Sequence, residues 1–215
     1  MIKSENTKRV AFDLGNVLFH VDLMPFITEL VNRQVYSSYD EAGDFMDGIC
    51  PGHDLGLYSV SSAISSFNPH ISRTDLDVLC RVWADTIRPC NEMIDLVRDL
   101  ISSRYDVALL SNVGSDHVGV IRRWLPIEIW DKTIHYFSCN TGTRKPDRLF
   151  YQSFHSKNEG WPTDTFFFDD KEENVIGCDG YFRGVHFNLA DFSSGIKAAK
   201  AVRAFLLDSR SQGVV

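Results

Sequence analysis

The sequence predicts an α/β fold built on a five-stranded parallel sheet, and two observations support this prediction. After residue 89, short apolar runs alternate with helix-like segments, a pattern typical of a parallel sheet with crossover helices. Before residue 89, one apolar run is followed by a long segment that is helical almost throughout. The 215 residues suffice for one large domain or for a domain with an insertion.

The first strand is predicted at residues 10–12. This apolar run, Val-Ala-Phe, is too short for an ordinary helix, and it ends on Asp13 followed by the turn signal Gly15-Asn16. A carboxylate is therefore expected at the carboxyl end of a buried strand, which is the edge of an open α/β sheet where ligands bind. On this stretch alone, Asp13 is equally well explained as a residue that caps the following turn.

The segment from Pro25 to residue 87 is predicted to be a small helical bundle. Pro25 suits the first turn of a helix, and Ser72 with Asp75 forms a capping pair for the last helix. Between these helices, residues 50–54 (Cys-Pro-Gly-His-Asp) are expected to form a turn-rich loop.

Four further strands and their connecting helices are predicted in alternation. The strands are expected at residues 106–110, 133–137, 165–168 and 184–187. Helices are predicted over residues 91–103, 172–178 and about 198–206. Two more are predicted between these, one that begins at residue 115 and one that ends at residue 154.

Polar groups follow four of the five predicted strands. They are Asp13, Ser111-Asn112, the Lys145 loop and Asp169-Asp170. Because the carboxyl ends of parallel strands meet at one edge of a sheet, we expect these groups to converge. Three acids, a hydroxyl and a lysine at one edge are hard to assign to stability. This convergence favours a catalytic role for Asp13 over a capping role.

Composition and charge exclude several classes of function. The net charge of −7 and the absence of a Lys/Arg-rich run argue against nucleic acid as a partner. No apolar stretch approaches membrane-spanning length, and the amino terminus lacks the apolar core of a signal peptide, so a cytoplasmic protein is expected. Five widely spaced cysteines without a Cys-x-x-Cys motif are expected to be reduced thiols. No pattern distinguishes a monomer from a homodimer.

Four ordered motifs resemble those of the haloacid-dehalogenase-like (HAD) superfamily of phosphohydrolases. They are Phe12-Asp-Leu-Gly-Asn-Val17, Leu109-Leu-Ser-Asn112, Lys145-Pro-Asp147 and Phe167-Phe-Asp-Asp-Lys-Glu-Glu-Asn174. The resemblance covers essentially the whole chain. It implies a Rossmann-like three-layer core of residues 1–20 and 88–215, and an inserted helical cap of residues 21–87. The form of the first motif is similar to the branch that includes α-D-glucose-1-phosphate phosphatases.

The resemblance implies a Mg²⁺-dependent phosphatase of small phosphorylated metabolites, with sugar phosphates as the expected substrates. Asp13 would attack the phosphoryl group and form an aspartyl-phosphate. Mg²⁺ prefers carboxylate, phosphate and water oxygens. It would be held by Asp13, Asp170 and the backbone carbonyl of Gly15, with Asp169 assisting.

The remaining motif residues receive supporting roles from the same resemblance. Ser111 and Lys145 would bind the phosphoryl oxygens during transfer. Asn174 would orient the acids without binding the metal itself. Asn112 is expected either to contact the phosphate or to form a turn.

One position departs from the pattern of the family. The usual phosphatase motif has a second Asp two residues after the nucleophile, which transfers protons to and from the reacting oxygens. Here that position is Gly15, and general acid–base catalysis typically contributes about 10²–10⁴-fold. The candidates to replace this acid are His20, Asp22, His53 and Asp54. His20 and His53 are also candidates for contacting the substrate, against the plainer alternative of ordinary polar residues.

Two other functions remain open. A non-catalytic phosphate-binding or regulatory protein would tolerate Gly15, but the retention of Asp13, Ser111, Lys145 and Asp170 together favours catalysis. A dehalogenase on the same fold needs no metal, and the Asp169-Asp170 pair speaks against it. Substrate specificity is expected to lie in the cap, around residues 50–57.

Overall fold

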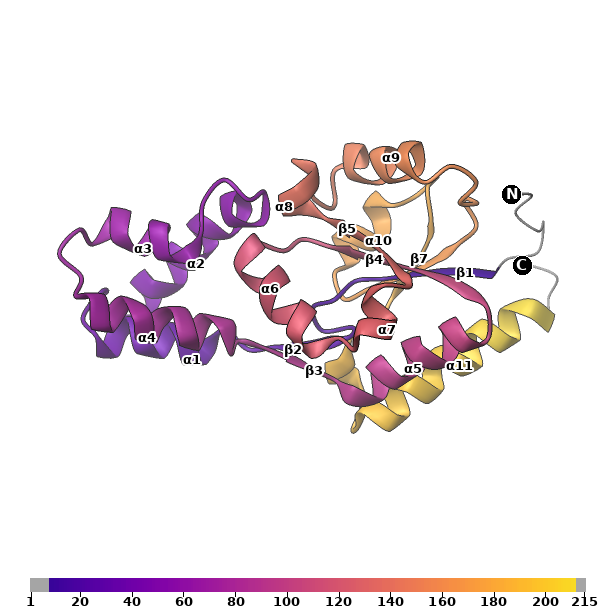
Figure 1. Cartoon of the computed structure of the whole chain (residues 1–215), viewed down its shortest axis with the longest axis horizontal. Coiled ribbons are helices and arrows are strands. Elements are labelled where there is room, and N and C mark those ends of the chain that lie inside the picture. Colours follow the sequence, from indigo (N-terminus) through magenta and orange to yellow (C-terminus); the bar gives the residue numbers. More distant parts are fainter. Residues whose placement is uncertain (1–7, 212–215) are drawn as a thin grey trace.

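Figure 1 shows the computed structural model of the chain, which describes residues 8–211, with side chains up to residue 208. The chain folds into a larger α/β unit and a smaller unit of four helices. The two units lie side by side along the long axis of the molecule and are joined by a narrow pair of strands.

The larger unit is built on a five-stranded sheet in which all neighbouring strands are parallel. Across the sheet, the order is β5 (Thr133–Phe137), β4 (Tyr105–Ser111), β1 (Lys8–Phe12), β6 (Phe166–Asp169) and β7 (Arg183–His186). The register pairs Phe12 with Leu109 on one side and with Phe168 on the other. The strands that carry the predicted site residues therefore end at one edge. All five predicted strands are confirmed.

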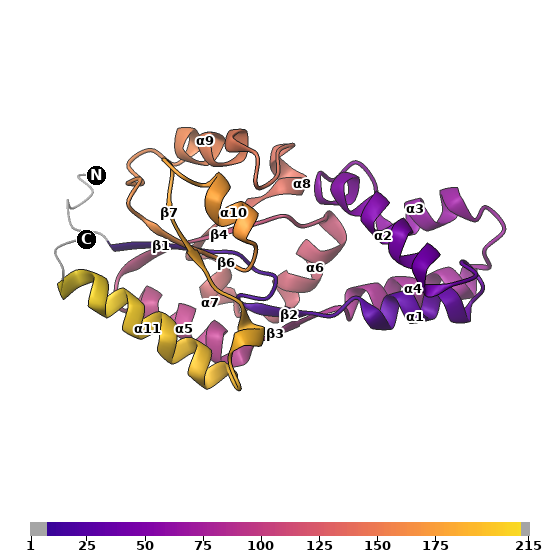
Figure 2. The ribbon, with the colours of Figure 1, turned by 180° about the vertical axis from the view of Figure 1, so that it is seen from behind.

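Alternate side chains of the strands face two different layers of helices. In β1, Val10 and Phe12 pack in one cluster and Ala11 packs in the other. The first cluster includes residues of α5 (Asn91–Ser102), α6 (Ser115–Trp124), α7 (Ile127–Trp130) and α11 (Gly195–Ser211). The second includes α9 (Arg148–Lys157), beside the short α10 (Glu172–Gly177). Figure 2 shows α9 and α10 on the opposite side of the sheet from α5 and α11. The predicted three-layer arrangement is confirmed.

The smaller unit consists of α1 (Met24–Asn32), α2 (Tyr39–Asp54), α3 (Val60–Phe67) and α4 (Arg73–Ala84), and we call it the four-helix unit. It has an apolar core of its own, which includes Phe26, Leu30, Phe45, Ile64, Leu79 and Trp83. Pro25 lies in the first turn of α1, and the Ser72 side chain accepts a hydrogen bond from the Asp75 backbone at the start of α4. Both predicted helix starts are confirmed.

Two short strands that the sequence did not predict connect the units. They are β2 (Phe19–Val21) and β3 (Ile87–Pro89), and they pair antiparallel. Three residues are too few for a periodic pattern to be visible in the sequence. The helical prediction therefore extended to residue 87, which lies in β3. Two further short helical elements are α8 (Ser138–Thr141) and η1 (Leu189–Asp191).

The prediction of a loop at residues 50–54 is wrong, because these residues form the end of α2. Pro51 lies inside the helix, close to its carboxyl end, where its missing N–H removes only one helical hydrogen bond. The face of α2 that carries Phe45, Met46 and His53 is buried. Burial of this face outweighs the local helix-breaking tendency of the Pro-Gly pair.

The cysteines and the length of the helices bear on two expectations from the sequence. All five cysteines are free thiols. Among residues 8–211, no helix is both long and apolar enough to cross a membrane.

The aromatic cluster around α9 supports a prediction about stability. Phe154 is fully buried and its ring contacts those of Tyr136, Trp161 and Phe182. Replacing Phe154 with Ala should lower the free energy of unfolding by about 3–5 kcal/mol, because the cavity left behind cannot refill. In the same helix, Leu149 is 56% exposed, so Leu149→Ala should cost less than about 0.5 kcal/mol. Urea denaturation of both variants tests this, and equal losses would contradict the packing described.

Candidate active site

Asp13 follows directly after the central strand β1. Its backbone N–H donates to the Phe168 carbonyl at 2.8 Å, which extends the pairing of β1 with β6 by one residue. The chain then reverses in a tight turn, in which the backbone N–H groups of Leu18 and Phe19 both donate to the Leu14 carbonyl. Asp13 is buried, with 7% of its surface exposed. The turn therefore holds the carboxylate at the bottom of a cavity.

Lys145 holds Asp13 in place through a fully buried ammonium group. Lys145 Nζ lies 2.9 Å from Asp13 Oδ1 and 2.5 Å from Asp169 Oδ2, and it also donates to the Leu110 carbonyl at 2.9 Å. Two of its three N–H donors are thus used in hydrogen bonds to Leu110 and Asp169, and Asp13 is held as an ion pair. Lys145 is 1% exposed, so the predicted convergence of the lysine with the acids is observed in a water-excluded site.

Asp169 has both carboxylate oxygens occupied by donors of the protein. Oδ2 accepts a hydrogen bond from Lys145 Nζ. Oδ1 accepts hydrogen bonds from the Lys171 backbone N–H and from Asn174 Nδ2, both at 2.9 Å. Asp169 is completely buried. The contact from Asn174 is the supporting role that the sequence predicted for this residue.

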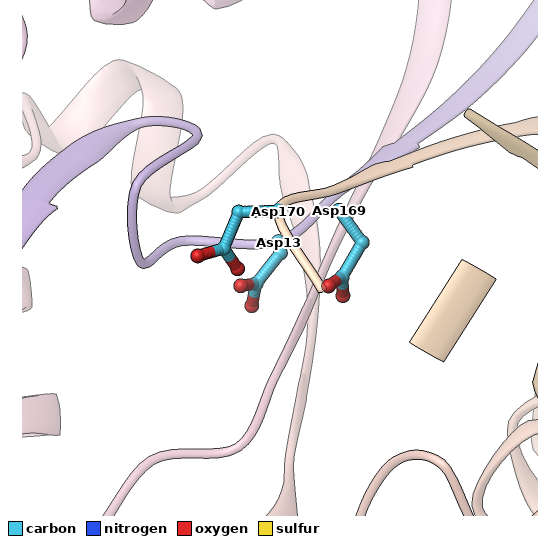
Figure 3. Close-up of side chains that lie close together, drawn as sticks. All are labelled: Asp13, Asp169 and Asp170. Atoms are coloured by element: carbon cyan, nitrogen blue, oxygen red, sulfur yellow. The ribbon is translucent and has the colours of Figure 1, made fainter. Parts of the chain in front are cut away.

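Asp170 is the more accessible of the two adjacent acids. Its Oδ2 accepts a hydrogen bond at 3.0 Å from Asn16 Nδ2, and Asn16 has a left-handed backbone, with φ of 51°, that Asn tolerates better than most residues. Figure 3 shows the carboxylates of Asp13, Asp169 and Asp170 next to one another. One oxygen from each lies within 4.8 Å of the others.

The acid cluster fits a hard divalent cation. The pKa of Asp13 is raised to about 6, chiefly by burial, which outweighs the opposing effect of Lys145, and with smaller contributions from the charges of Asp169 and Asp170. Burial also raises the pKa of Asp170. Three carboxylates thus face one buried ammonium, and oxygen ligands of this kind suit Mg²⁺. Because the oxygens of Asp169 are occupied, Asp13 and Asp170 are the side chains that fit the role of direct ligands.

A cavity of about 220 Å³ lies over these residues. Its walls include Asp13, Gly15, Ser111, Lys145, Asp170 and Asn174 from the predicted set. Two residues of α2, Cys50 and Asp54, also line the cavity. The exposed Lys171 and the half-buried Arg144 line it as well. The structure therefore brings most of the predicted site residues together in one polar cavity.

The side chain of Asn112 makes contacts that neither of its two predicted roles included. Its Oδ1 accepts from the Lys145 backbone N–H and its Nδ2 donates to the Lys145 carbonyl, both at 2.8 Å. These two bonds tie the end of β4 to the loop that carries Lys145. Asn112 is therefore a positioning residue for Lys145, although it also lines the cavity.

The four candidates for the missing proton-transfer group separate into two pairs. His20 and Asp22 are exposed and lie outside the cavity of Asp13, and Asp22 accepts from the Met24 backbone N–H at the start of α1. Asp54 lines the cavity, with its Oδ2 3.0 Å from Arg144 Nη2. His53 is buried beside it.

Arg144 and Asp116 lie where the two units meet and are not among the residues predicted from the sequence. Arg144 binds Asp54 of α2, and Asp116 Oδ2 accepts from the Val60 backbone N–H at 2.8 Å and lies 3.4 Å from His53 Nε2. Arg144 directly precedes Lys145 in the sequence, so its place near the site could have been inferred. Asp116 has no comparable signal, because its partners are about sixty residues away in the chain.

Three features are typical of the HAD-like fold: acids at the ends of two neighbouring parallel strands, here β1 and β6, a buried lysine between these acids, and a helical insertion after the first strand. The chain has this fold, as its motifs predicted. No protein family model matches the chain.

Comparison with known proteins agrees with this fold. A HAD family enzyme from Bacteroides thetaiotaomicron, solved with magnesium and inorganic phosphate, is 20% identical and superposes with a TM-score of 0.72, covering 88% of this chain and 98% of that one. A predicted HAD-like family hydrolase from Porphyromonas gingivalis, also 20% identical, gives a TM-score of 0.75 over 93% of this chain and 98% of that one. Among curated proteins, a sesquiterpene phosphatase from Aspergillus oryzae is 29% identical over 179 residues, which are 80% of this chain and 84% of that protein.

The buried Lys145 leads to a prediction about stability and pH. Lys145→Met leaves two buried carboxylates without their counter-charge, which should lower the free energy of unfolding by about 3–5 kcal/mol near neutral pH. Without Lys145, the pKa of Asp13 rises further above that of the unfolded chain. The folded variant therefore binds more protons than the unfolded one, and its stability should increase as the pH falls from about 7 to about 5, more steeply than in wild type.

Chemical denaturation across this pH range measures the effect. The matched control is Lys171→Met, which changes an exposed lysine of the same cavity and should cost less than about 1 kcal/mol. A Lys145→Met protein as stable as the control would show that the buried charges are not coupled as described.

Proposed function

We propose that the chain is a Mg²⁺-dependent phosphomonoesterase in which Asp13 is the nucleophile. The observation that carries this proposal is the cluster of Asp13, Asp169 and Asp170 around one buried lysine, in a cavity large enough for a phosphate group. The similarity to a phosphatase and to an enzyme solved with magnesium and phosphate supports it. The cluster is also the feature that a metal-free dehalogenase would not need.

The two carboxylate oxygens of Asp13 have different surroundings, which leaves one of them available for attack. Oδ1 is held by Lys145, whereas Oδ2 lies on the side of Gly15. In the proposed first step, Oδ2 forms a bond to phosphorus, and the bond from phosphorus to the alcohol oxygen breaks. In the second step, a water oxygen attacks phosphorus, inorganic phosphate leaves and the Asp13 carboxylate is regenerated.

The surrounding residues stabilise the phosphoryl group during both steps. Lys145 and Ser111 line the cavity, and in this proposal they bind the phosphoryl oxygens. Mg²⁺, held by Asp13, Asp170 and the Gly15 carbonyl, would supply the positive charge that lets an anionic ester approach the carboxylates. Asp169 keeps Lys145 in position, and Asn174 keeps Asp169 in position.

Asp54 is the group that we propose for proton transfer in place of the missing acid. It belongs to the four-helix unit, which we propose as the cap domain of residues 21–87, and it lines the same cavity as Asp13. Its position allows it to protonate the leaving alcohol and later to accept a proton from water.

The alcohol part of the substrate has two candidate classes. The first motif favours sugar phosphates, and the curated relative is a sesquiterpene phosphatase, whose name implies an apolar alcohol.

The nucleophile can be tested with an activated aryl phosphate such as p-nitrophenyl phosphate. Wild-type protein should release phosphate only with Mg²⁺, and Asp13→Asn should lower kcat by at least about 10⁴-fold. Asp179→Asn is the matched control, because Asp179 is exposed and lies outside the cavity. If wild type releases no more phosphate than Asp13→Asn, the non-catalytic alternative replaces the proposal.

The role of Asp54 predicts a dependence on the leaving group. Asp54→Asn should lower kcat for an alkyl phosphate by about 10² or more, because an alkoxide needs a proton to leave. The same variant should hydrolyse p-nitrophenyl phosphate nearly as fast as wild type. Steady-state kinetics on both esters distinguish this from a purely structural role through Arg144, which would slow both reactions equally.

A further inference from the structure

A second cavity adjoins the cavity of Asp13, at the junction of the four-helix unit and the α/β unit. Its volume is about 140 Å³. The two cavities share walls formed by Gly15, Val21, Cys50, Asp54, Ser111 and Asn112. A phosphate bound at Asp13 can therefore carry an organic group that extends into the second cavity.

Away from the shared residues, the walls of the second cavity are mostly apolar. They are formed by Leu14, Phe19, Leu23, Ile87, Val113 and Ile121, with the indole of Trp83. These side chains come from both units and from both linking strands. For comparison, a cavity of about 150 Å³ lined by Leu, Ile and Phe binds benzene. The volume here thus suits a hydrocarbon group of the size of a six-membered ring.

Of the two imidazoles of this cavity, only that of His117 is hydrogen-bonded to other groups of the protein. His117 Nε2 lies 2.9 Å from the Trp83 carbonyl and 3.2 Å from Thr86 Oγ1. His53 Nε2 lies 3.4 Å from the Asp116 carboxylate without a hydrogen bond, and Trp83 Nε1 also has no hydrogen-bond partner. These two groups can pair with at most two hydroxyl groups of a ligand. The remaining hydroxyl groups of a sugar ring placed here would face apolar walls. Each hydroxyl left without a hydrogen bond lowers affinity by about tenfold.

We propose that this cavity binds the alcohol part of the phosphate ester, and that the substrate is the monophosphate of an apolar alcohol rather than a sugar phosphate. The hydrocarbon group next to the phosphate is about the size of a six-membered ring. This inference rests on the proposed phosphatase function and decides between the two classes of alcohol left open above. The four-helix unit then selects the substrate by closing an apolar wall around it.

A matched pair of esters tests the inference directly. Cyclohexylmethyl phosphate and glucose 6-phosphate are both primary alkyl phosphates with a six-membered ring, and they differ mainly in the ring oxygen and hydroxyl groups. We expect kcat/KM to be at least about 100-fold higher for cyclohexylmethyl phosphate, which corresponds to two unpaired hydroxyls at about tenfold each. Equal values, or a preference for the sugar ester, would overturn the inference.

A variant pair locates the preference in the second cavity. Val113→Thr places one hydroxyl on its wall with little change of shape, and it should lower the preference for the apolar ester by about tenfold. Val120→Thr makes the same change at a residue of similar burial, 6% against 7% exposed, that does not line the cavity. It should leave the preference unchanged. An equal effect of both variants would contradict the assignment.

Parallel measurements separate a failure of this inference from a failure of the proposed function. If p-nitrophenyl phosphate is hydrolysed with Mg²⁺ but the apolar ester is not preferred, the phosphatase function stands and the inference falls. If no ester is hydrolysed, calorimetry of wild-type protein with the two alkyl esters still tests the cavity. Tighter binding of cyclohexylmethyl phosphate would support the inference, and equal or absent binding would overturn it.

Discussion

The buried ammonium group of Lys145 is the interaction on which the candidate site depends. It joins the ends of three strands, through Asp13 after β1, Leu110 in β4 and Asp169 in β6. Removing a charge from water costs several kcal/mol, so such a group is stable only when opposite charges and hydrogen-bond acceptors surround it. This requirement fixes the three strand ends relative to one another. The nucleophile is consequently held in one position before any substrate binds.

The position of the four-helix unit follows from the same sheet edge. The chain leaves the central strand at Asp13, forms the four helices and returns through β3, so the insertion starts beside the reactive carboxylate. The end of α2 then reaches back to the larger unit. The Asp54 carboxylate binds Arg144, and its backbone carbonyl accepts from Ser138 Oγ. These contacts close the junction at which the polar and apolar cavities meet.

Sequence patterns predicted the sheet and the acid cluster because both depend on local signals. A short apolar run followed by an acid marks a strand end, and parallel strands bring such ends together, as for Asp13 and Asp170. Other features depend on contacts between remote segments. Asn112 became a tether for Lys145 only because two loops meet, and the helix containing Pro51 persists only because its other face is buried. The apolar cavity is equally invisible in the sequence, since its walls come from both units.

The central claim is that Asp13 itself carries the phosphoryl group during turnover. It can be tested by mixing the protein with p-nitrophenyl phosphate and Mg²⁺, quenching with acid within one turnover and analysing the peptide that contains Asp13 by mass spectrometry. The account predicts a transient phosphoryl group on this peptide, which rises with the release of p-nitrophenol and then decays. Turnover without phosphorylation of this peptide, or with the phosphoryl group on another residue, would contradict it.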